Sequence, residues 1–196
     1  MKSLWIAPLL LVATALPAHA REAASPAMVA VEAQAAALTR NSYVWNEVPG
    51  AVGPLRVVVS IADQRAYVYR GETMIAAASV STGKDGKETP AGEYPILQKA
   101  VKHKSNLYNS APMPYMQRLT WDGIALHAGN NPGFPDSHGC VRLPAAFAKR
   151  LFAATEVGTT VSVVEEPIML QSDLSPIEDP ALTTAETAQI AALGGR

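Results

Sequence analysis

The chain has 196 residues, enough for one domain of ordinary size plus terminal segments. It contains 16 basic and 17 acidic residues, which gives a formal net charge of −1. A balance this close to neutral provides no electrostatic reason to expect nucleic acid or an anionic membrane surface as a partner.

The first 20 residues have the features of an export signal. Lys2 supplies a short positive region, the stretch from Leu4 to Leu16 is almost wholly apolar, and Ala18-His19-Ala20 has the small-x-small form of a cleavage site. The apolar stretch is shorter than a membrane-spanning helix requires, so cleavage after Ala20 is expected rather than an uncleaved anchor helix. We therefore expect a mature protein without a membrane span, located in the periplasm or cell envelope.

The remaining sequence predicts a mainly β fold with one or two short helices. Residues 21–52 are expected to be a linker whose Ala-rich part, 27–38, forms at most a short helix. A β-rich domain is expected over residues 53–165. In chain order it contains an antiparallel meander (55–61, 65–69, 73–80), a strand (92–100), a hairpin (115–119, 124–127), a helix (144–155) and a closing strand (160–164). Pro, Ser, Thr, Ala and acidic residues then predominate, so residues 166–196 are expected to be a flexible tail.

Cys140 is the single cysteine of the chain, so no internal disulfide can form. Disulfides persist outside the cytoplasm. An unpaired thiol in an exported protein is therefore either a buried small apolar side chain or a group retained for its chemistry. Its neighbours favour chemistry, because Cys140 lies in a Gly/Pro/Asn-rich loop between an expected strand and an expected helix. Loops held by a rigid scaffold commonly carry reactive groups.

Two histidines are candidates to activate this thiol. A nucleophilic cysteine needs a base, together with donors where negative charge develops on the attacked carbonyl. His127 comes from a separate strand and can be aimed at the sulfur, whereas adjacent backbone geometry constrains His138, so His127 is the preferred base. Gly139 allows a tight bend, and the Gly139 and Cys140 amides can point at an oxyanion. His127, His138 and Cys140 could instead bind zinc, with Asp136 as fourth ligand, although their spacing matches no familiar pattern of zinc ligands.

Several motifs in this order resemble the L,D-transpeptidase catalytic domain family (YkuD-like). The first is the sequence from Ser137 to Arg142, Ser-His-Gly-Cys-Val-Arg, with His127 upstream. Supporting motifs are Ser81-Thr82-Gly83, Thr89-Pro90-Ala91-Gly92-Glu93-Tyr94 and Met113-Pro114-Tyr115. The resemblance spans about residues 55–164. The chain departs from many members in the short separation of 13 positions between His127 and Cys140, and in Ala128, where several members have Gly.

The resemblance implies a β-sandwich fold and acyl transfer on peptidoglycan stem peptides. Cys140 would attack a tetrapeptide stem at its third residue, release D-alanine and pass the acyl group to an amine. His127 would act as base, with its ring oriented by a main-chain carbonyl near Ala128 or Gly129, and His138 would assist or shape the pocket.

The remaining roles that the resemblance implies concern the oxyanion and the substrate. The amides of Gly139 and Cys140, with Tyr115, would stabilise the oxyanion. Arg142 and Ser137 would contact substrate, and Arg142 could equally brace the loop. No metal or organic cofactor is needed.

The sequence leaves three alternative hypotheses for the function. Transfer to water would make the protein an L,D-carboxypeptidase or another cysteine hydrolase of the same fold. A non-catalytic wall-binding module has no need of His127, Gly139 and Cys140 together, which counts against it. A zinc or redox protein is the third rival.

Overall fold

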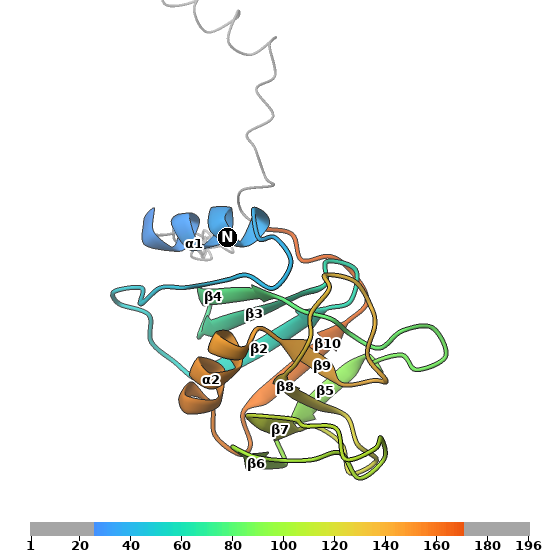
Figure 1. Cartoon of the computed structure of the whole chain (residues 1–196). Helices are drawn as coiled ribbons and strands as arrows, with labels where there is room; N and C mark the ends of the chain where they lie inside the picture. Colours follow the sequence, from blue (N-terminus) through green and yellow to red (C-terminus); the bar gives the residue numbers. More distant parts are fainter. Residues whose placement is uncertain (1–25, 171–196) are drawn as a thin grey trace, which may run out of the picture.

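The computed structural model describes residues 26–170 and contains two β-sheets and two helices (Figure 1). The expected export signal and residues 171–196 of the expected tail lie outside the described part. The larger sheet has six strands in the order β1-β4-β3-β2-β10-β5, and the smaller has four in the order β6-β7-β8-β9. The mainly β class predicted from the sequence is confirmed.

The larger sheet is built on the expected meander. β2 (Leu55–Ser60), β3 (Arg65–Arg70) and β4 (Thr73–Ser79) pair antiparallel in sequence order. The expected closing strand, β10 (Thr160–Val164), pairs parallel with β2 and antiparallel with β5 (Gly92–Pro95). The last strand of the domain therefore lies inside the sheet.

The smaller sheet carries the expected hairpin. β7 (Met116–Arg118) and β8 (Ala125–Ala128) are antiparallel, and β9 (Val141–Leu143) adds parallel to β8. The single strand expected over 92–100 is two strands, because the chain leaves the larger sheet after β5 and enters the smaller one as β6 (Gln98–Ala100). Ile96, at the crossing, is fully buried.

The segment expected to be a linker contains α1 (Pro26–Ala36) and β1 (Tyr43–Trp45). β1 extends the larger sheet beside β4, and α1 packs against both strands. Val31 and Ala35 of α1 are fully buried. Arg65 of β3 holds the end of α1 by donating to the carbonyls of Ala36 (3.1 Å) and Leu38 (3.3 Å). The described part of the expected linker is thus packed, because small side chains let an Ala-rich helix lie close to the sheet.

The helix α2 (Ala145–Ala154) begins directly after Pro144, as expected, and contacts β8. Its buried residues Phe147 and Leu151 join one apolar core with both sheets and α1. Phe147 also contacts the rings of Tyr43 and Trp45, at centroid distances of 5.7 and 5.6 Å. These contacts fix the position of α2, which in turn packs against β8, the strand that carries His127.

The first residues of the expected tail also pack on the domain. The Ser60 hydroxyl donates to the carbonyl of Glu166 (2.8 Å), the Ile168 amide donates to Asp63 (2.9 Å), and Leu170 is buried. No helix within residues 26–170 is long and apolar enough to cross a membrane.

Candidate active site

The pairing of β8 with β9 brings the expected catalytic residues to one face of the smaller sheet. His127 is the register partner of Arg142, and Leu126 is the partner of Val141. Cys140 directly precedes β9 and lies two residues from Arg142. Because alternate residues of a strand share a face, His127, Cys140 and Arg142 point to the same side.

A cleft of about 170 Å³ lies over this face. We call it the active-site cleft, and its lining residues come from three segments, 105–113, 127–130 and 137–142. His127, His138 and Cys140 all line it. The three residues that the sequence proposed for chemistry are therefore gathered in one place.

The imidazole of His127 is buried and held by the main chain. Its Nδ1 lies 2.8 Å from the carbonyl oxygen of Ala128 and donates to it, which leaves Nε2 as the acceptor atom of the ring. A Cβ on Gly129 would lie 3.3 Å from His127 Cε1, so Gly129 leaves room for the ring. Burial lowers the pKa of His127 and outweighs the opposing effect of the Ala128 carbonyl, so the ring is neutral at pH 7.

The thiol of Cys140 is also in its neutral form. Its Sγ donates to the carbonyl oxygen of Gly123 at 3.2 Å. Burial raises the pKa of Cys140 above its ordinary value, and the backbone hydrogen bond of Ala125 and the positive charges of Arg142 and Arg118 oppose this only in part. With a neutral imidazole in the same cleft, the resting pair is thiol and imidazole rather than thiolate and imidazolium.

The loop before Cys140 is held rigidly by two hydroxyl groups. Ser137, which is buried, donates to the carbonyl of Cys140 (2.5 Å) and accepts from the amide of Gly139 (3.0 Å). Thr89 donates to the carbonyl of Gly139 (2.8 Å) and accepts from the amide of Gly83 (2.8 Å). These bonds fix the backbone that presents the sulfur.

Two of the roles expected in this loop change as a result. The amide of Gly139 is engaged by Ser137, which leaves the Cys140 amide as the backbone donor for an oxyanion. Ser137 lines the cleft, but its hydroxyl proton is donated within the loop, to the carbonyl of Cys140. Gly139 is still required by the backbone, because its φ is 112°.

The tyrosine that lines the cleft is Tyr108, not the expected Tyr115. Tyr115 has a φ of 55° and packs on Phe152, with ring centroids 5.9 Å apart, and it is not among the residues that line the cleft. Tyr108 lines the cleft and stacks on His138 at a centroid distance of 4.6 Å. This contact gives His138 its position at the rim.

Arg142 lines the cleft and is also anchored within the protein. Its guanidinium donates to Asp136 at 2.8 Å, with side-chain exposures of 21% and 43%. Asp136, which the zinc alternative would use as a ligand, is therefore engaged by a cation. Among residues 26–170 there is no group of three or more His, Cys, Asp or Glu side chains that could hold a metal ion.

This geometry can be compared with known proteins. A model of the L,D-transpeptidase catalytic domain (YkuD) matches residues 54–163, more than half of the chain. The chain belongs to this family. It is 27% identical over 142 residues to the "Probable L,D-transpeptidase YbiS" of Escherichia coli strain K12, an alignment that covers 57% of this chain and 45% of that protein.

Two solved L,D-transpeptidase structures resemble this one. An enzyme from Stackebrandtia nassauensis has a TM-score of 0.55 and 26% identity, with 71% of this chain and 66% of that chain covered. The structure of LdtMt1 in complex with imipenem has a TM-score of 0.53 and 26% identity, with coverages of 56% and 58%. The chain thus spans less than half of its Escherichia coli relative and about three fifths to two thirds of these two structures.

Three residues at the site were not singled out from the sequence. Thr89 belongs to the Thr-Pro-Ala-Gly motif, and its buried hydroxyl joins that motif to the Cys140 loop. Gly123, which lies between the two strands of the expected hairpin, accepts the hydrogen bond of the thiol. Tyr108 had no local signal, because it lies in an irregular segment that only the tertiary fold brings over the cleft.

Proposed function

We propose that this chain is an exported peptidoglycan L,D-transpeptidase with Cys140 as nucleophile and His127 as base. The observation that carries the proposal is the shared cleft of the two side chains, in which the Ala128 carbonyl holds His127 Nδ1 and leaves Nε2 to accept a proton. Family membership supports the reaction class. The stem peptide as substrate and the periplasm or cell envelope as location belong to the proposal.

The first half-reaction forms a thioester. Because the resting pair is neutral, the thiol proton passes to His127 Nε2 as the sulfur attacks the carbonyl carbon of the third stem residue. The carbonyl π electrons move to oxygen, for which we assign the Cys140 amide as a hydrogen-bond donor. When the intermediate collapses, the C–N bond breaks, His127 returns its proton to the leaving nitrogen, and D-alanine departs.

The second half-reaction consumes the thioester. The acceptor amine loses a proton to His127, attacks the thioester carbon and expels the sulfur, which recovers its proton. The product is an amide cross-link, and the enzyme is regenerated. Because the thioester stores the energy of the broken amide, cross-linking outside the cell needs no nucleotide cofactor.

Arg142 supplies the positive charge of the cleft. Its side chain is partly exposed there even though one nitrogen is engaged by Asp136. A guanidinium can hold two carboxylates through different N–H groups. We assign Arg142 to a carboxylate of the stem peptide, with Asp136 holding the guanidinium in place.

Mass spectrometry of muropeptides tests the function. The enzyme and its Cys140→Ala variant are each incubated with disaccharide-tetrapeptide. We expect loss of D-alanine and a cross-linked dimer only with the unchanged enzyme. Tripeptide without dimer would instead show an L,D-carboxypeptidase.

Intact-protein mass spectrometry with imipenem tests the nucleophile separately from the substrate. LdtMt1 has been solved in complex with this compound. We expect one covalent adduct on this chain, absent from Cys140→Ala. A folded enzyme that gives neither product nor adduct would support the wall-binding module instead.

A further inference from the structure

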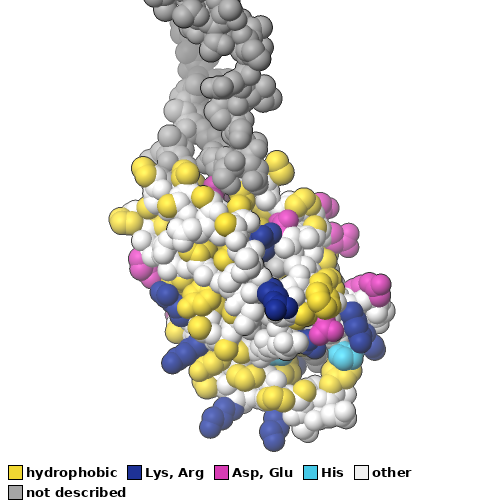
Figure 2. All heavy atoms as spheres, turned by 45° about the horizontal axis from the view of Figure 1, so that its top comes forward, with side chains coloured by type: hydrophobic (Ala, Val, Ile, Leu, Met, Phe, Trp, Pro, Cys, Tyr) yellow, Lys and Arg dark blue, Asp and Glu magenta, His cyan; other side chains and the backbone are white. Residues whose placement is uncertain are grey.

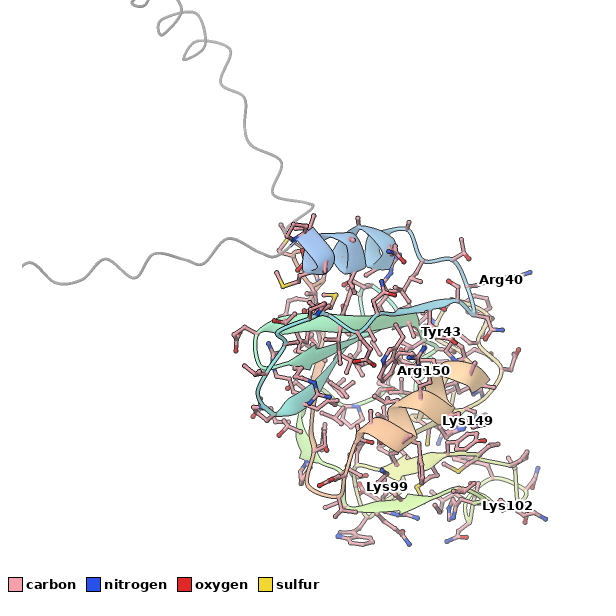
Figure 3. The ribbon with its side chains drawn as sticks, turned by 90° about the vertical axis from the view of Figure 1, so that its left-hand side faces the viewer. Arg40, Tyr43, Lys99, Lys102, Lys149 and Arg150 are labelled. Atoms are coloured by element: carbon pink, nitrogen blue, oxygen red, sulfur yellow. The ribbon has the colours of Figure 1, made fainter. Side chains whose placement is uncertain are left out.

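One face of the molecule carries a row of positive side chains outside the active-site cleft. Figure 3 shows the row passing from the loop after α1, across α2, to β6 and the segment that follows it. We call it the cationic face, and its members are Arg40, Lys99, Lys102, Lys149 and Arg150. Arg40, Lys102, Lys149 and Arg150 are exposed, and Tyr43 is half-buried beside them.

No carboxylate forms a salt bridge with this row among residues 26–170, although Glu156 acts on Lys99 through its charge. The two salt bridges among residues 26–170 lie elsewhere, at Arg56–Glu72 and Arg142–Asp136. Lys99 and Arg150 are held by other groups. The Lys99 ammonium donates to the carbonyls of Phe152 and Thr155, and the Arg150 guanidinium lies 5.0 Å from the centroid of the Trp45 ring. The exposed members, Arg40, Lys102 and Lys149, form no salt bridge, and like charges gathered on one face favour an anionic partner.

The near-neutral balance of the whole chain conceals this segregation. Residues 98–154 contain seven Lys or Arg but only two Asp or Glu, whereas residues 26–97 contain six and seven, and residues 155–170 contain none and three. On the face seen in Figure 2, the lower end carries dark-blue side chains and no magenta ones. The part of the domain that carries the cleft is therefore the positive part.

The cationic face adjoins the active-site cleft at its Lys102 end. Lys102 lines an apolar-walled hollow of about 450 Å³ together with Val101, His103, Lys104, Pro112 and Pro114. Pro112 also lines the cleft, so one segment borders both. At the other end, Arg40 lies against Gly133, in the loop that leads to Cys140. A polymer bound in the cleft can therefore continue onto this face.

We propose that the cationic face binds peptidoglycan through the free carboxylates of stem peptides next to the one in the cleft. The inference rests on the proposed function, because it takes peptidoglycan as the polymer. Peptide stems present carboxylates at intervals along the strand, which suits several spaced cations better than a single deep pocket. Such binding keeps the enzyme on the polymer between turnovers.

Sedimentation with insoluble, protein-free peptidoglycan tests this in the Cys140→Ala background, where no turnover occurs. The face variant is Arg40→Gln/Lys102→Gln/Lys149→Gln, which spares the packed Lys99 and Arg150. The matched control, Arg70→Gln/Lys84→Gln/Lys87→Gln, removes the same charge elsewhere. We expect the face variant to bind about tenfold more weakly and the control less than about twofold. Thermal unfolding of both variants checks that they are folded.

Two further arms identify the ligand chemistry. Peptidoglycan whose carboxylates are amidated with carbodiimide and ethanolamine should bind as weakly as the face variant, and 0.5 M NaCl should have the same effect. Equal binding of the face variant and the unchanged chain, or of amidated and native polymer, would overturn the proposal. So would face-dependent binding to phosphatidylglycerol vesicles but not to peptidoglycan, which would identify a membrane surface. The unchanged chain could prove inactive on tetrapeptide while sedimentation still depends on the cationic face. That result would refute the proposed function but support the cationic face as a binding surface.

Discussion

Replacing Gly139 by alanine tests why the residue before the nucleophile is a glycine. Gly139 has a φ of 112°, and a Cβ there would lie 2.8 Å from Ile124 Cδ1. Holding an L-residue at such a φ costs about 1–2 kcal/mol, and overpacking typically adds about 1–3 kcal/mol. The Ile124 methyl is the far end of a side chain and can move in part. We therefore expect Gly139→Ala to lower the free energy of unfolding by about 3 kcal/mol.

Gly158 provides a matched control for the backbone contribution alone. Its φ is 94°, and a Cβ there would meet no atom within 4 Å. Gly158→Ala should therefore cost only about 1–2 kcal/mol. Ile124→Val removes the obstructing methyl, so Gly139→Ala should cost less in that background, as a double-mutant cycle would show. Urea unfolding followed by tryptophan fluorescence gives all four values. Equal losses for Gly139→Ala and Gly158→Ala would refute the steric argument.

Three further predictions concern the groups around the nucleophile. Thr89→Val removes the donor to the buried Gly139 carbonyl and should lower the free energy of unfolding in urea by about 1–3 kcal/mol. Because burial raises the pKa of Cys140 above 9.0, its alkylation by iodoacetamide should still be accelerating with pH beyond pH 9. Arg142→Gln should raise KM for the tetrapeptide about tenfold. Asp136→Asn breaks a partly exposed ion pair and should change the free energy of unfolding by less than about 1 kcal/mol.

Each of these has its own control. Thr89→Ser keeps the hydroxyl and should retain most of the stability; a loss equal to that of valine would point to packing instead. The thiol keeps its proton in the folded chain at pH values where the unfolded chain loses it. Stability should therefore fall as pH rises above about 9, and Cys140→Ala should abolish that part of the fall. An unchanged KM for Arg142→Gln would leave Arg142 as a brace of the loop only.

The sequence predicted the elements whose signals are local. The meander, the closing strand and the helix α2 were placed within one or two residues, because alternation and helical spacing are properties of short segments. The export signal and residues 171–196 lie outside the described part, so those expectations stay predictions.

Elements that depend on partners were not predictable in the same way. β1 and β9 have three residues each, too few to show a pattern, and exist because β4 and β8 offer hydrogen bonds. α1 was underestimated because a count of large apolar residues overlooks how closely alanine packs. Nothing in the sequence showed that the strand expected over 92–100 would divide between two sheets.

The site shows the same division. Cys140 and His127 could be predicted because the motif and its spacing are present in the sequence, and both side chains line one cleft. The direction of the Tyr115 side chain could not be predicted, because its φ of 55° turns the side chain toward Phe152. The use of the Ser137 hydroxyl within its own loop likewise depends on a backbone bend that residue types do not specify.

The position of β10 has a consequence for how the protein reaches its native state. β10 is the last of the strands within residues 26–170 but lies between β2 and β5, and its partners in β2 precede it by about a hundred residues. Contacts of such large sequence separation slow folding, because a long loop must close before they form. A chain that ends after Cys140 and before Thr160 would hold the whole catalytic motif but leave β5 without its partner. Assembly of the reactive site is therefore deferred until nearly all of the domain has been synthesised.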